Sequence, residues 1–583
     1  MPGPYSVKFD SNVPLMLRDG TMTYADVCRP DAAGKFPGLL MRTPYDKGES
    51  ASRSWTIDVI RGAQRGYAMV IQDVRGRFSS DGEFYPFINE ARDGYDSVEW
   101  VASQPWCNGK VGMFGSSYIG ATQWLAASAK PPSLGGIAPG VTASDYHEGW
   151  TWQGGAFELG FNLSWSIGSL TANNWQNLSK QLFLSPYQHD LLVQSQDDVM
   201  LAADHLPLDG YEDLQGGLAP YYYDWLEHPE YDDYWRSISI EEMHHNIDVP
   251  AFNYGGWYDI FVGGTTRNFI GMRESAATAE ARSGQRLVVG PWTHGGLRST
   301  VMGERSFGVA SLSTEGDVAS RLLRFYDYLL YGEENGFTDD KPVSIFVMGD
   351  NVWRNEDEWP LSRAIATNYY LNSSGKANSL NGDGTLGPGL PNGGPPDVFL
   401  YNPMDPVPTN GGNLCCDAAT LVSGVFDQRP IETRADVLVY TSDVMDRDIE
   451  VTGPIVLTLY ASSSAIDTDF TAKLVDVRPD GYAMNICDGI IRARYRTPRQ
   501  PATYLEPGDV YEFKIDLGPT SNVFKKDHSI RVEISSSNFP RFDRNLNTGK
   551  PIGSDNSFVP ALQTIHHSPE YPSHISLPIV PRD

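Results

Sequence analysis

The sequence has no long apolar run, few cysteines and few basic residues. No segment approaches the roughly 20 apolar residues that cross a membrane, and the chain does not begin with a basic stretch followed by an apolar one, the pattern of a secretory signal. Only five of the 583 residues are cysteines, an odd number that is widely spaced except for the adjacent Cys415-Cys416 and has no CxxC pair, which argues against a disulfide framework and a zinc site. We therefore expect a cytoplasmic protein with no membrane partner and no metal.

Basic residues are outnumbered by acidic ones, 45 to 73, and the net charge of −28 counts against nucleic acid and anionic membranes as partners. The imbalance is greatest at residues 146–235, where fourteen acidic residues accompany one basic residue, Lys180. Two interpretations of this segment remain open. Its carboxylates either form a solvated surface, or some of them face the mouth of an active site and attract substrates that carry an amine.

Three stretches of different character divide the chain. Residues 1–145 alternate apolar strand-like runs with helical spacing, and the alternation resumes at residues 241–353, which predicts one α/β domain with a doubly wound, mostly parallel sheet. The intervening residues 146–240 are rich in aromatic residues and helical patterns, and we expect a helical cap. From residue 354 to 583, short alternating strands separated by turn residues predict a jelly roll or β-sandwich.

The strongest local motif lies at residues 111–120, where an apolar strand runs into Gly115-Ser116-Ser117 and a helix-forming stretch follows. This is the pattern of the nucleophile elbow, a tight turn that lifts a serine hydroxyl above a sheet. The usual second glycine of G-x-S-x-G comes one residue late, at Gly120. Counted from Gly115, the nucleophile is Ser117, and the rival Ser116 is expected to fill the small position at the turn.

A serine nucleophile needs a positioned base, and in α/β-hydrolases the order along the chain is Ser, then Asp or Glu, then His. Asp259 follows the strand-like run at residues 251–254, and His294 follows the one at residues 286–290. We expect these two residues to complete a triad with Ser117. The order excludes six other histidines and disfavours four in the C-terminal part: His147, His189, His205, His228, His244 and His245, and then His528, His566, His567 and His574.

Several further stretches form a specific set together with these motifs. They are Arg42-Thr43-Pro44-Tyr45-Asp46-Lys47, residues 72–76, 80–83, 106–120, 256–259 and 290–294, and residues 462–476 and 535–549 of the C-terminal part. In this set the sequence resembles the cocaine esterase family of serine hydrolases, whose relatives include X-prolyl dipeptidyl aminopeptidases and α-amino-acid ester hydrolases. The resemblance implies an α/β-hydrolase domain with an inserted helical cap and a C-terminal jelly roll.

The resemblance also implies roles for individual residues. In the family, the tyrosine of the Pro-Tyr-Asp-Lys motif donates its hydroxyl to the oxyanion, and here that residue is Tyr45. The second donor is expected to be the backbone N–H of Tyr118, as the elbow geometry already requires. By the same resemblance, Trp150, Trp165 and Phe261 line the acyl pocket.

A loop at residues 411–430 corresponds to one that borders the active site in the family. It is longer here and carries Leu414-Cys415-Cys416. Leu414 is expected to contact the substrate. We expect Cys415 and Cys416 to be reduced side chains in a loop or a pocket wall.

The function predicted from these observations is that of a carboxylesterase acting on esters with a bulky or aromatic acyl group, without metal or organic cofactor. An X-Pro dipeptidyl aminopeptidase and an α-amino-acid ester or β-lactam acylase are the alternatives within the class. An alternative of another class is a non-catalytic carbohydrate-binding protein with an inert hydrolase domain. The expected partner is a small ester or amide substrate, and a homodimer is left open.

Overall fold

A ten-stranded sheet forms the centre of the N-terminal half of the chain. The computed structural model describes residues 4–49, 56–182, 184–312, 316–416 and 420–582. The strand order is β1-β2-β4-β3-β5-β6-β9-β10-β13-β14, and every neighbouring pair from β4 to β13 is parallel. The strands are β1 (Val7–Met16), β2 (Met22–Pro30), β3 (Phe36–Thr43), β4 (Ala68–Asp73), β5 (Cys107–Ser116), β6 (Leu134–Gly140), β9 (Phe252–Tyr258), β10 (Arg286–Thr293), β13 (Val343–Val347) and β14 (Val352–Glu356).

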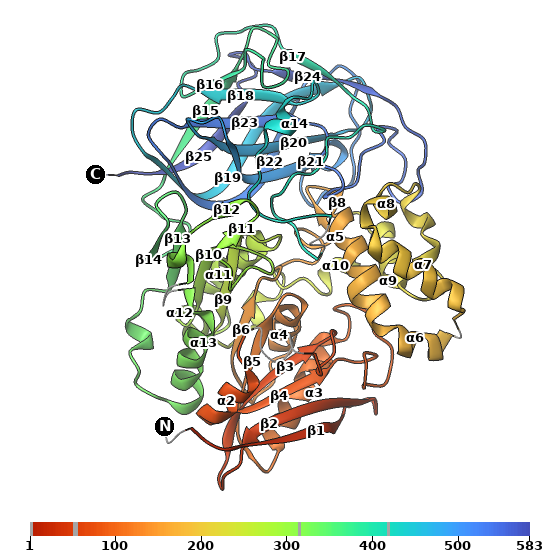
Figure 1. The fold of residues 1–583 in the computed structure, drawn as a ribbon, viewed down its shortest axis with the longest axis vertical. Helices are drawn as coiled ribbons and strands as arrows, with labels where there is room; N and C mark the ends of the chain where they lie inside the picture. The colour runs from red at the N-terminus through yellow and green to blue at the C-terminus, as the bar shows by residue number, and fades with distance from the viewer. Residues whose placement is uncertain (1–3, 50–55, 183, 313–315, 417–419, 583) are drawn as a thin grey trace.

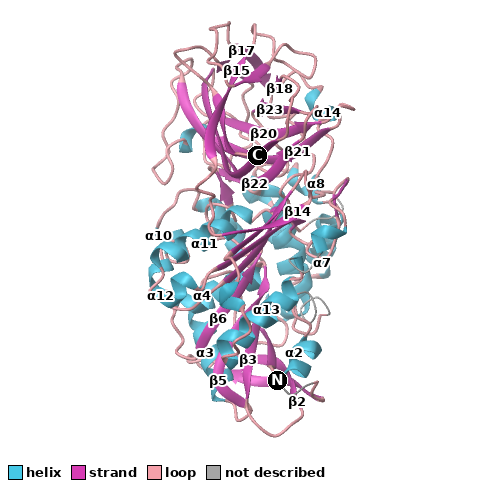
Figure 2. Cartoon of the chain, turned by 90° about the vertical axis from the view of Figure 1, so that its left-hand side faces the viewer, coloured by secondary structure: helices cyan, strands magenta, loops and turns pink. Residues whose placement is uncertain are grey.

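Helices flank this sheet on both sides (Figure 2), which explains why β3, β4, β9 and β10 are buried along their whole length. Capping residues define both ends of α2: the Asp58 side chain accepts from the backbone N–H of Arg61 at its start, and Gly66 ends the helix in the left-handed conformation. The helices are α2 (Val59–Arg65), α3 (Glu90–Ser103), α4 (Tyr118–Ser128), α11 (Val262–Ser275), α12 (Ala279–Ser283) and α13 (Val318–Tyr326).

A helical insertion leaves the sheet after β6 and returns at β9, and it lies to one side of the sheet in Figure 1, in orange to yellow. Because β6 and β9 are neighbouring parallel strands, the insertion takes the place of a single crossover connection and leaves the sheet order intact. Its main helices are α5 (Leu159–Ser164), α6 (Trp175–Leu182), α7 (Pro186–Asp197), α8 (Val199–Ala203), α9 (Pro220–Glu227) and α10 (Asp233–Arg236), with a π-helical turn at Trp165–Thr171 and a small hairpin of β7 (Trp152–Gln153) and β8 (Ala156–Phe157).

The C-terminal part is a β-sandwich, drawn at the top of Figure 1 in green to blue. Its central strand β19 (Ile449–Ser463) pairs with β22, β24 and β25, and burial alternates along β19 and β24, as expected for strands with one face in a core. The other strands are β15 (Ile365–Asn372), β16 (Thr385–Gly387), β17 (Asp397–Tyr401), β18 (Leu438–Ser442), β20 (Asp469–Val477), β21 (Ala483–Arg492), β22 (Tyr511–Phe524), β23 (Ser529–Ser535), β24 (Ala561–His566) and β25 (His574–Val580). The predicted fold class is therefore confirmed, and no described helix is long and apolar enough to span a membrane.

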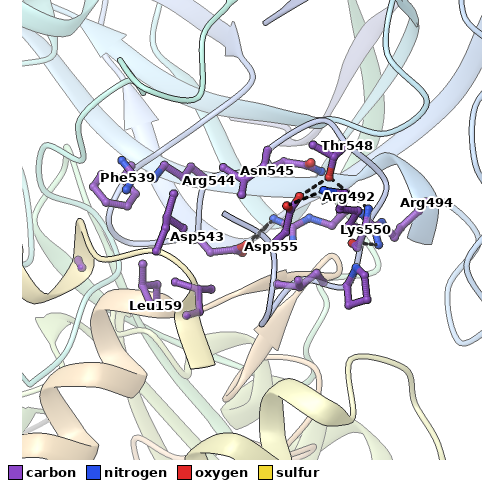
Figure 3. Close-up of a pocket in the computed structure, with 16 residues that line it drawn as sticks. Leu159, Arg492, Arg494, Phe539, Asp543, Arg544, Asn545, Thr548, Lys550 and Asp555 are labelled. Atoms are coloured by element: carbon purple, nitrogen blue, oxygen red, sulfur yellow. Dashed lines mark hydrogen bonds and ion pairs between the residues drawn. The ribbon is translucent and has the colours of Figure 1, made fainter. Parts of the chain in front are cut away.

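A buried charge cluster joins the β-sandwich to the helical insertion, and Figure 3 labels two of its residues, Arg492 and Asp543. Arg492, at the end of β21, donates to both Asp469 and Asp543, at 2.8–2.9 Å. Asp543 in turn accepts from the backbone N–H of Phe157, the last residue of β8, at 2.7 Å. All three charged side chains are almost fully shielded from water, so each depends on its partners for the interactions that water would otherwise supply.

We expect Arg492→Met to lower the free energy of unfolding by about 3–5 kcal/mol, because it leaves two buried carboxylates without their cation. Urea denaturation measures this change. The matched control is Arg236→Met, since Arg236 pairs with Asp233 on the surface with 50% and 97% of the two side chains exposed; its change should stay within about 0.5 kcal/mol. Equal losses for the two variants would contradict the structural role of the cluster.

Candidate active site

The parallel sheet brings four residues of the sequence motifs to one edge. Tyr45, Ser117, Asp259 and His294 follow the carboxyl ends of β3, β5, β9 and β10, respectively. Since β3 lies beside β5 and β9 lies beside β10, with only β6 between the two pairs, the loops that leave these strands meet above the middle of the sheet. This edge is where ligands bind in open α/β sheets.

The turn between β5 and α4 has the backbone of a nucleophile elbow. Ser117 has φ 64° and ψ −131°, a region rarely populated by residues with a side chain. Gly115 has φ 132°, and a Cβ there would lie 2.4 Å from Ile119. A Cβ on Gly120 would lie 2.9 Å from Thr142, so the glycine that comes one residue late in the motif is the one that lets α4 pack against the exit of β6.

Ser117, His294 and Asp259 form a continuous hydrogen-bonded set. His294 Nε2 lies 3.0 Å from Ser117 Oγ, and His294 Nδ1 lies 2.7 Å from Asp259 Oδ1. Asp259 is fully buried, while Ser117 and His294 each keep a small exposed fraction. Ser116 points elsewhere: its hydroxyl lies 2.9 Å from that of Tyr254 in the interior.

Two donors flank the serine. The hydroxyl of Tyr45 accepts from the indole N–H of Trp165 at 2.9 Å, which fixes the oxygen and leaves its proton free to be donated. Burial raises the pKa of Tyr45 to about 12, against smaller opposing effects of hydrogen bonds with Trp165 and Ser117, so the hydroxyl keeps its proton at neutral pH. Tyr118 is the first residue of α4, and its backbone N–H therefore has no acceptor within the helix.

A cavity of about 630 Å³ opens above Ser117 and His294, within the usual range for small-molecule sites. Of the four predicted substrate-contacting residues, Trp165 and Leu414 line it. Trp150 and Phe261 are completely buried behind the wall. Phe261 stacks on Trp150 with centroids 4.3 Å apart and meets the His294 ring edge-on at 5.3 Å, so this pair supports the histidine and the aromatic wall.

The structure corrects one expectation about the wall. Cys415 and Cys416, expected to be reduced, are joined by a disulfide bond and both line the cavity. The other wall residues are Met41, Glu49, Thr56, Ile119, Ser169, Asn173, Thr293, Gly295, Leu421 and Ser423. They come from strands, helices and loops that are far apart in the sequence. Some of them lie within the motifs named above, but no motif predicted that these side chains would line the cavity.

Carboxylates of the helical insertion do not line the cavity within the described part of the chain. The insertion contributes Trp165, Ser169 and Asn173, and the one described acidic residue of the lining is Glu49, from the loop after β3. This favours the interpretation of the acidic segment as a solvated surface. No group of three or more metal-ligating side chains occurs among the described residues, and the absence of a cofactor stays a prediction.

A serine hydrogen-bonded to a histidine, which is in turn hydrogen-bonded to an aspartate, at the carboxyl edge of a doubly wound sheet, is the arrangement of a serine hydrolase of the α/β-hydrolase class. Two family models match the chain: X-Pro dipeptidyl-peptidase of the S15 family at residues 19–296, and the C-terminal non-catalytic domain of X-Pro dipeptidyl-peptidase at residues 335–576.

Cocaine esterase of Rhodococcus sp. (strain MB1 Bresler) is 42% identical over 591 residues, covering 100% of both chains. The chain therefore belongs to the cocaine esterase family of serine hydrolases, and it is a serine esterase. Two solved structures share the whole architecture. An aminopeptidase from the marine sediment archaeon Thaumarchaeota archaeon has a TM-score of 0.81 at 25% identity, covering 99% of this chain and 97% of that one. An α-amino-acid ester hydrolase, with a TM-score of 0.78, 24% identity and the same coverage, shows the shared fold alone.

The two adjacent serines can be separated by labelling with a fluorophosphonate, which reacts with an activated serine. We expect Ser117→Ala to abolish labelling, because of the two serine hydroxyls that of Ser117 is the one that contacts His294. Ser116→Ala should keep it, since the Ser116 hydroxyl bonds to Tyr254 and not to the histidine. Labelling that survives in the Ser117 variant and disappears in the Ser116 variant would reverse the assignment.

Proposed function

We propose that this serine esterase cleaves carboxylic esters with a bulky, including aromatic, acyl group, and that Ser117 is its nucleophile. The observation that carries the proposal is the position of the His294 imidazole, which lines the cavity and lies within hydrogen-bond distance of both Ser117 Oγ and Asp259 Oδ1. A hydroxyl becomes nucleophilic at neutral pH when such a base removes its proton.

The reaction proceeds in two halves. Ser117 Oγ attacks the ester carbonyl as His294 Nε2 takes its proton, and Asp259 holds the imidazole in place and stabilises its positive charge. The Tyr45 hydroxyl and the Tyr118 N–H donate to the oxyanion that forms. His294 then gives its proton to the departing alcohol, leaving an acyl-serine. Water, deprotonated by the same nitrogen, hydrolyses the acyl-serine and frees the enzyme.

The wall of the cavity supports a bulky acyl group. Trp165 lines the cavity with only 1% of its surface exposed, and its N–H bonds to Tyr45, so one side chain joins the cavity wall to the expected oxyanion donor. Trp150 and Phe261 pack behind it and hold the surface in place. Aromatic walls of this kind bind apolar and aromatic groups by burial and ring contacts.

An ester without a charged amine fits the cavity better than a peptide or an amino-acid ester. A substrate with a free α-amino group needs a carboxylate partner once it is desolvated, and Glu49, the one described acid in the lining, is exposed to solvent. The family membership removes the alternative of an inert, carbohydrate-binding protein. The homodimer and the cytoplasmic location stay predictions.

We expect Ser117→Ala, His294→Ala and Asp259→Asn each to lower kcat by about 10⁴–10⁶, with the aspartate variant least affected, because triad members act as a unit. Steady-state hydrolysis of an aryl ester measures this, with circular dichroism as the check on folding. His245→Ala, which removes an exposed histidine that precedes β9 and does not line the cavity, is the control. Losses below about tenfold in the His294 variant would rule out this residue as the base.

Tyr45→Phe should lower kcat by about 10²–10³ with little change in KM, as expected for the loss of one oxyanion donor. Tyr254→Phe is the matched control, because it removes another buried tyrosine hydroxyl close to the elbow, one that bonds to Ser116 and Thr56 and not to Ser117. A rise in KM at constant kcat for the Tyr45 variant would make this residue a pocket wall.

A further inference from the structure

A disulfide between adjacent residues forms part of the active-site wall. Cys415 and Cys416 line the same cavity as Ser117 and His294, together with Leu414 and Leu421 of their loop. Leu414 and Cys415 are buried, whereas Cys416 is exposed. The bond thus lies at the boundary between the packed wall and solvent, where a small thiol reagent can reach it.

The base of this loop is fixed independently of the disulfide. Gly412 and Gly424 exchange two backbone hydrogen bonds, at 2.8 and 2.9 Å. The Asn413 side-chain amide donates to the backbone carbonyls of Trp257 and Asp259, at 3.0 Å each. The loop is therefore attached to the exit of β9, which carries the catalytic aspartate, by contacts that involve neither sulfur.

The disulfide restrains Cys415 and Cys416 themselves, which take no part in these contacts. A bond between neighbouring cysteines closes a small ring that includes the peptide bond between them, so both side chains are held in one arrangement. Cys416 has φ 74°, in the left-handed region that residues with a side chain seldom adopt. Such a conformation persists only where the surroundings impose it, and the covalent ring supplies that restraint.

We propose that the Cys415–Cys416 pair is a specificity-determining wall of the cavity, and that its reduction changes which esters are accepted while the Ser117–His294–Asp259 set stays intact. The proposal rests on the esterase function proposed above. With the ring closed, the wall is preorganised for a bulky acyl group. With the ring open, the two side chains separate and the wall must be ordered again when a bulky substrate binds.

The reductant is a dithiol. One of its thiolates attacks the sulfur of Cys416, the more exposed residue of the pair, and forms a mixed disulfide, and Cys415 departs as a thiolate. The second thiol of the reductant attacks the reductant's own sulfur in the mixed disulfide, which releases Cys416 and leaves the reductant as a cyclic disulfide. Two electrons pass to the protein, and two protons complete the thiols of Cys415 and Cys416.

The test compares 4-nitrophenyl acetate with 4-nitrophenyl benzoate before and after treatment with dithiothreitol. A thiol titration of the denatured, air-exposed protein should find three free thiols, from Cys28, Cys107 and Cys487, and all five cysteines after reduction. Reduction should raise KM for the benzoate about tenfold, the size of effect that one methylene has in a hydrophobic pocket. KM for the acetate, whose acyl group does not reach the wall, should stay unchanged.

The double variant Cys415→Ser/Cys416→Ser is the matched control. It should show the benzoate KM of the reduced enzyme and no response to dithiothreitol, and it should still be labelled by a fluorophosphonate, because Ser117 and His294 are unchanged. Five free thiols in the air-exposed protein, or equal benzoate kinetics for the oxidised and reduced wild type, would overturn the proposal. If the untreated wild type were not labelled by the fluorophosphonate, the proposed esterase site itself would be refuted.

Discussion

Parallel pairing of five neighbouring strands is the constraint on which the site depends. In the order β3-β5-β6-β9-β10 all carboxyl ends lie at one edge of the sheet, so loops that are far apart in the sequence meet there. Ser117 and His294 are 177 residues apart, yet their side chains lie 3.0 Å from each other. A helical insertion between β6 and β9 does not disturb this arrangement, because those two strands remain neighbours.

The two parts outside the sheet each hold in place one residue of the proposed active site. The helical insertion holds Tyr45 through the indole N–H of Trp165. The β-sandwich holds the exit of β9, since Asn413 binds the Asp259 carbonyl and the Tyr258 hydroxyl donates to the Asn485 carbonyl. The cavity is thus built from all three parts of the chain, and its shape depends on their contacts as well as on the sheet.

Much of this could be predicted from the sequence, because strand exits and the elbow have local signatures. The apolar runs before Ser117, Asp259 and His294 indicate strands, and chain order then selects the acid and the base. The cavity wall could not be predicted in the same way. Whether Trp150 lines the cavity or packs behind its wall depends on contacts between segments that are far apart in the sequence, such as its stacking on Phe261. Composition likewise does not show whether the acidic side chains of the insertion point into the cavity or into solvent.

The bond between Cys415 and Cys416 could not be predicted from the sequence either. The spacing of Cys415 and Cys416 carries no information about whether their sulfurs meet, because that depends on the backbone of the loop, including φ 74° at Cys416. The base of the loop is set by Asn413 and the Gly412–Gly424 pairing. These are tertiary contacts, and no motif in the sequence predicts them.

The most direct measurement is a crystal structure of the adduct formed with an aryl phosphonate, whose tetrahedral phosphorus resembles the transition state of acyl transfer. The account predicts phosphorus bonded to Ser117 Oγ, with the phosphonyl oxygen within hydrogen-bond distance of the Tyr45 hydroxyl and the Tyr118 N–H. Phosphorus on any other residue, or a phosphonyl oxygen that faces away from both donors, would contradict it.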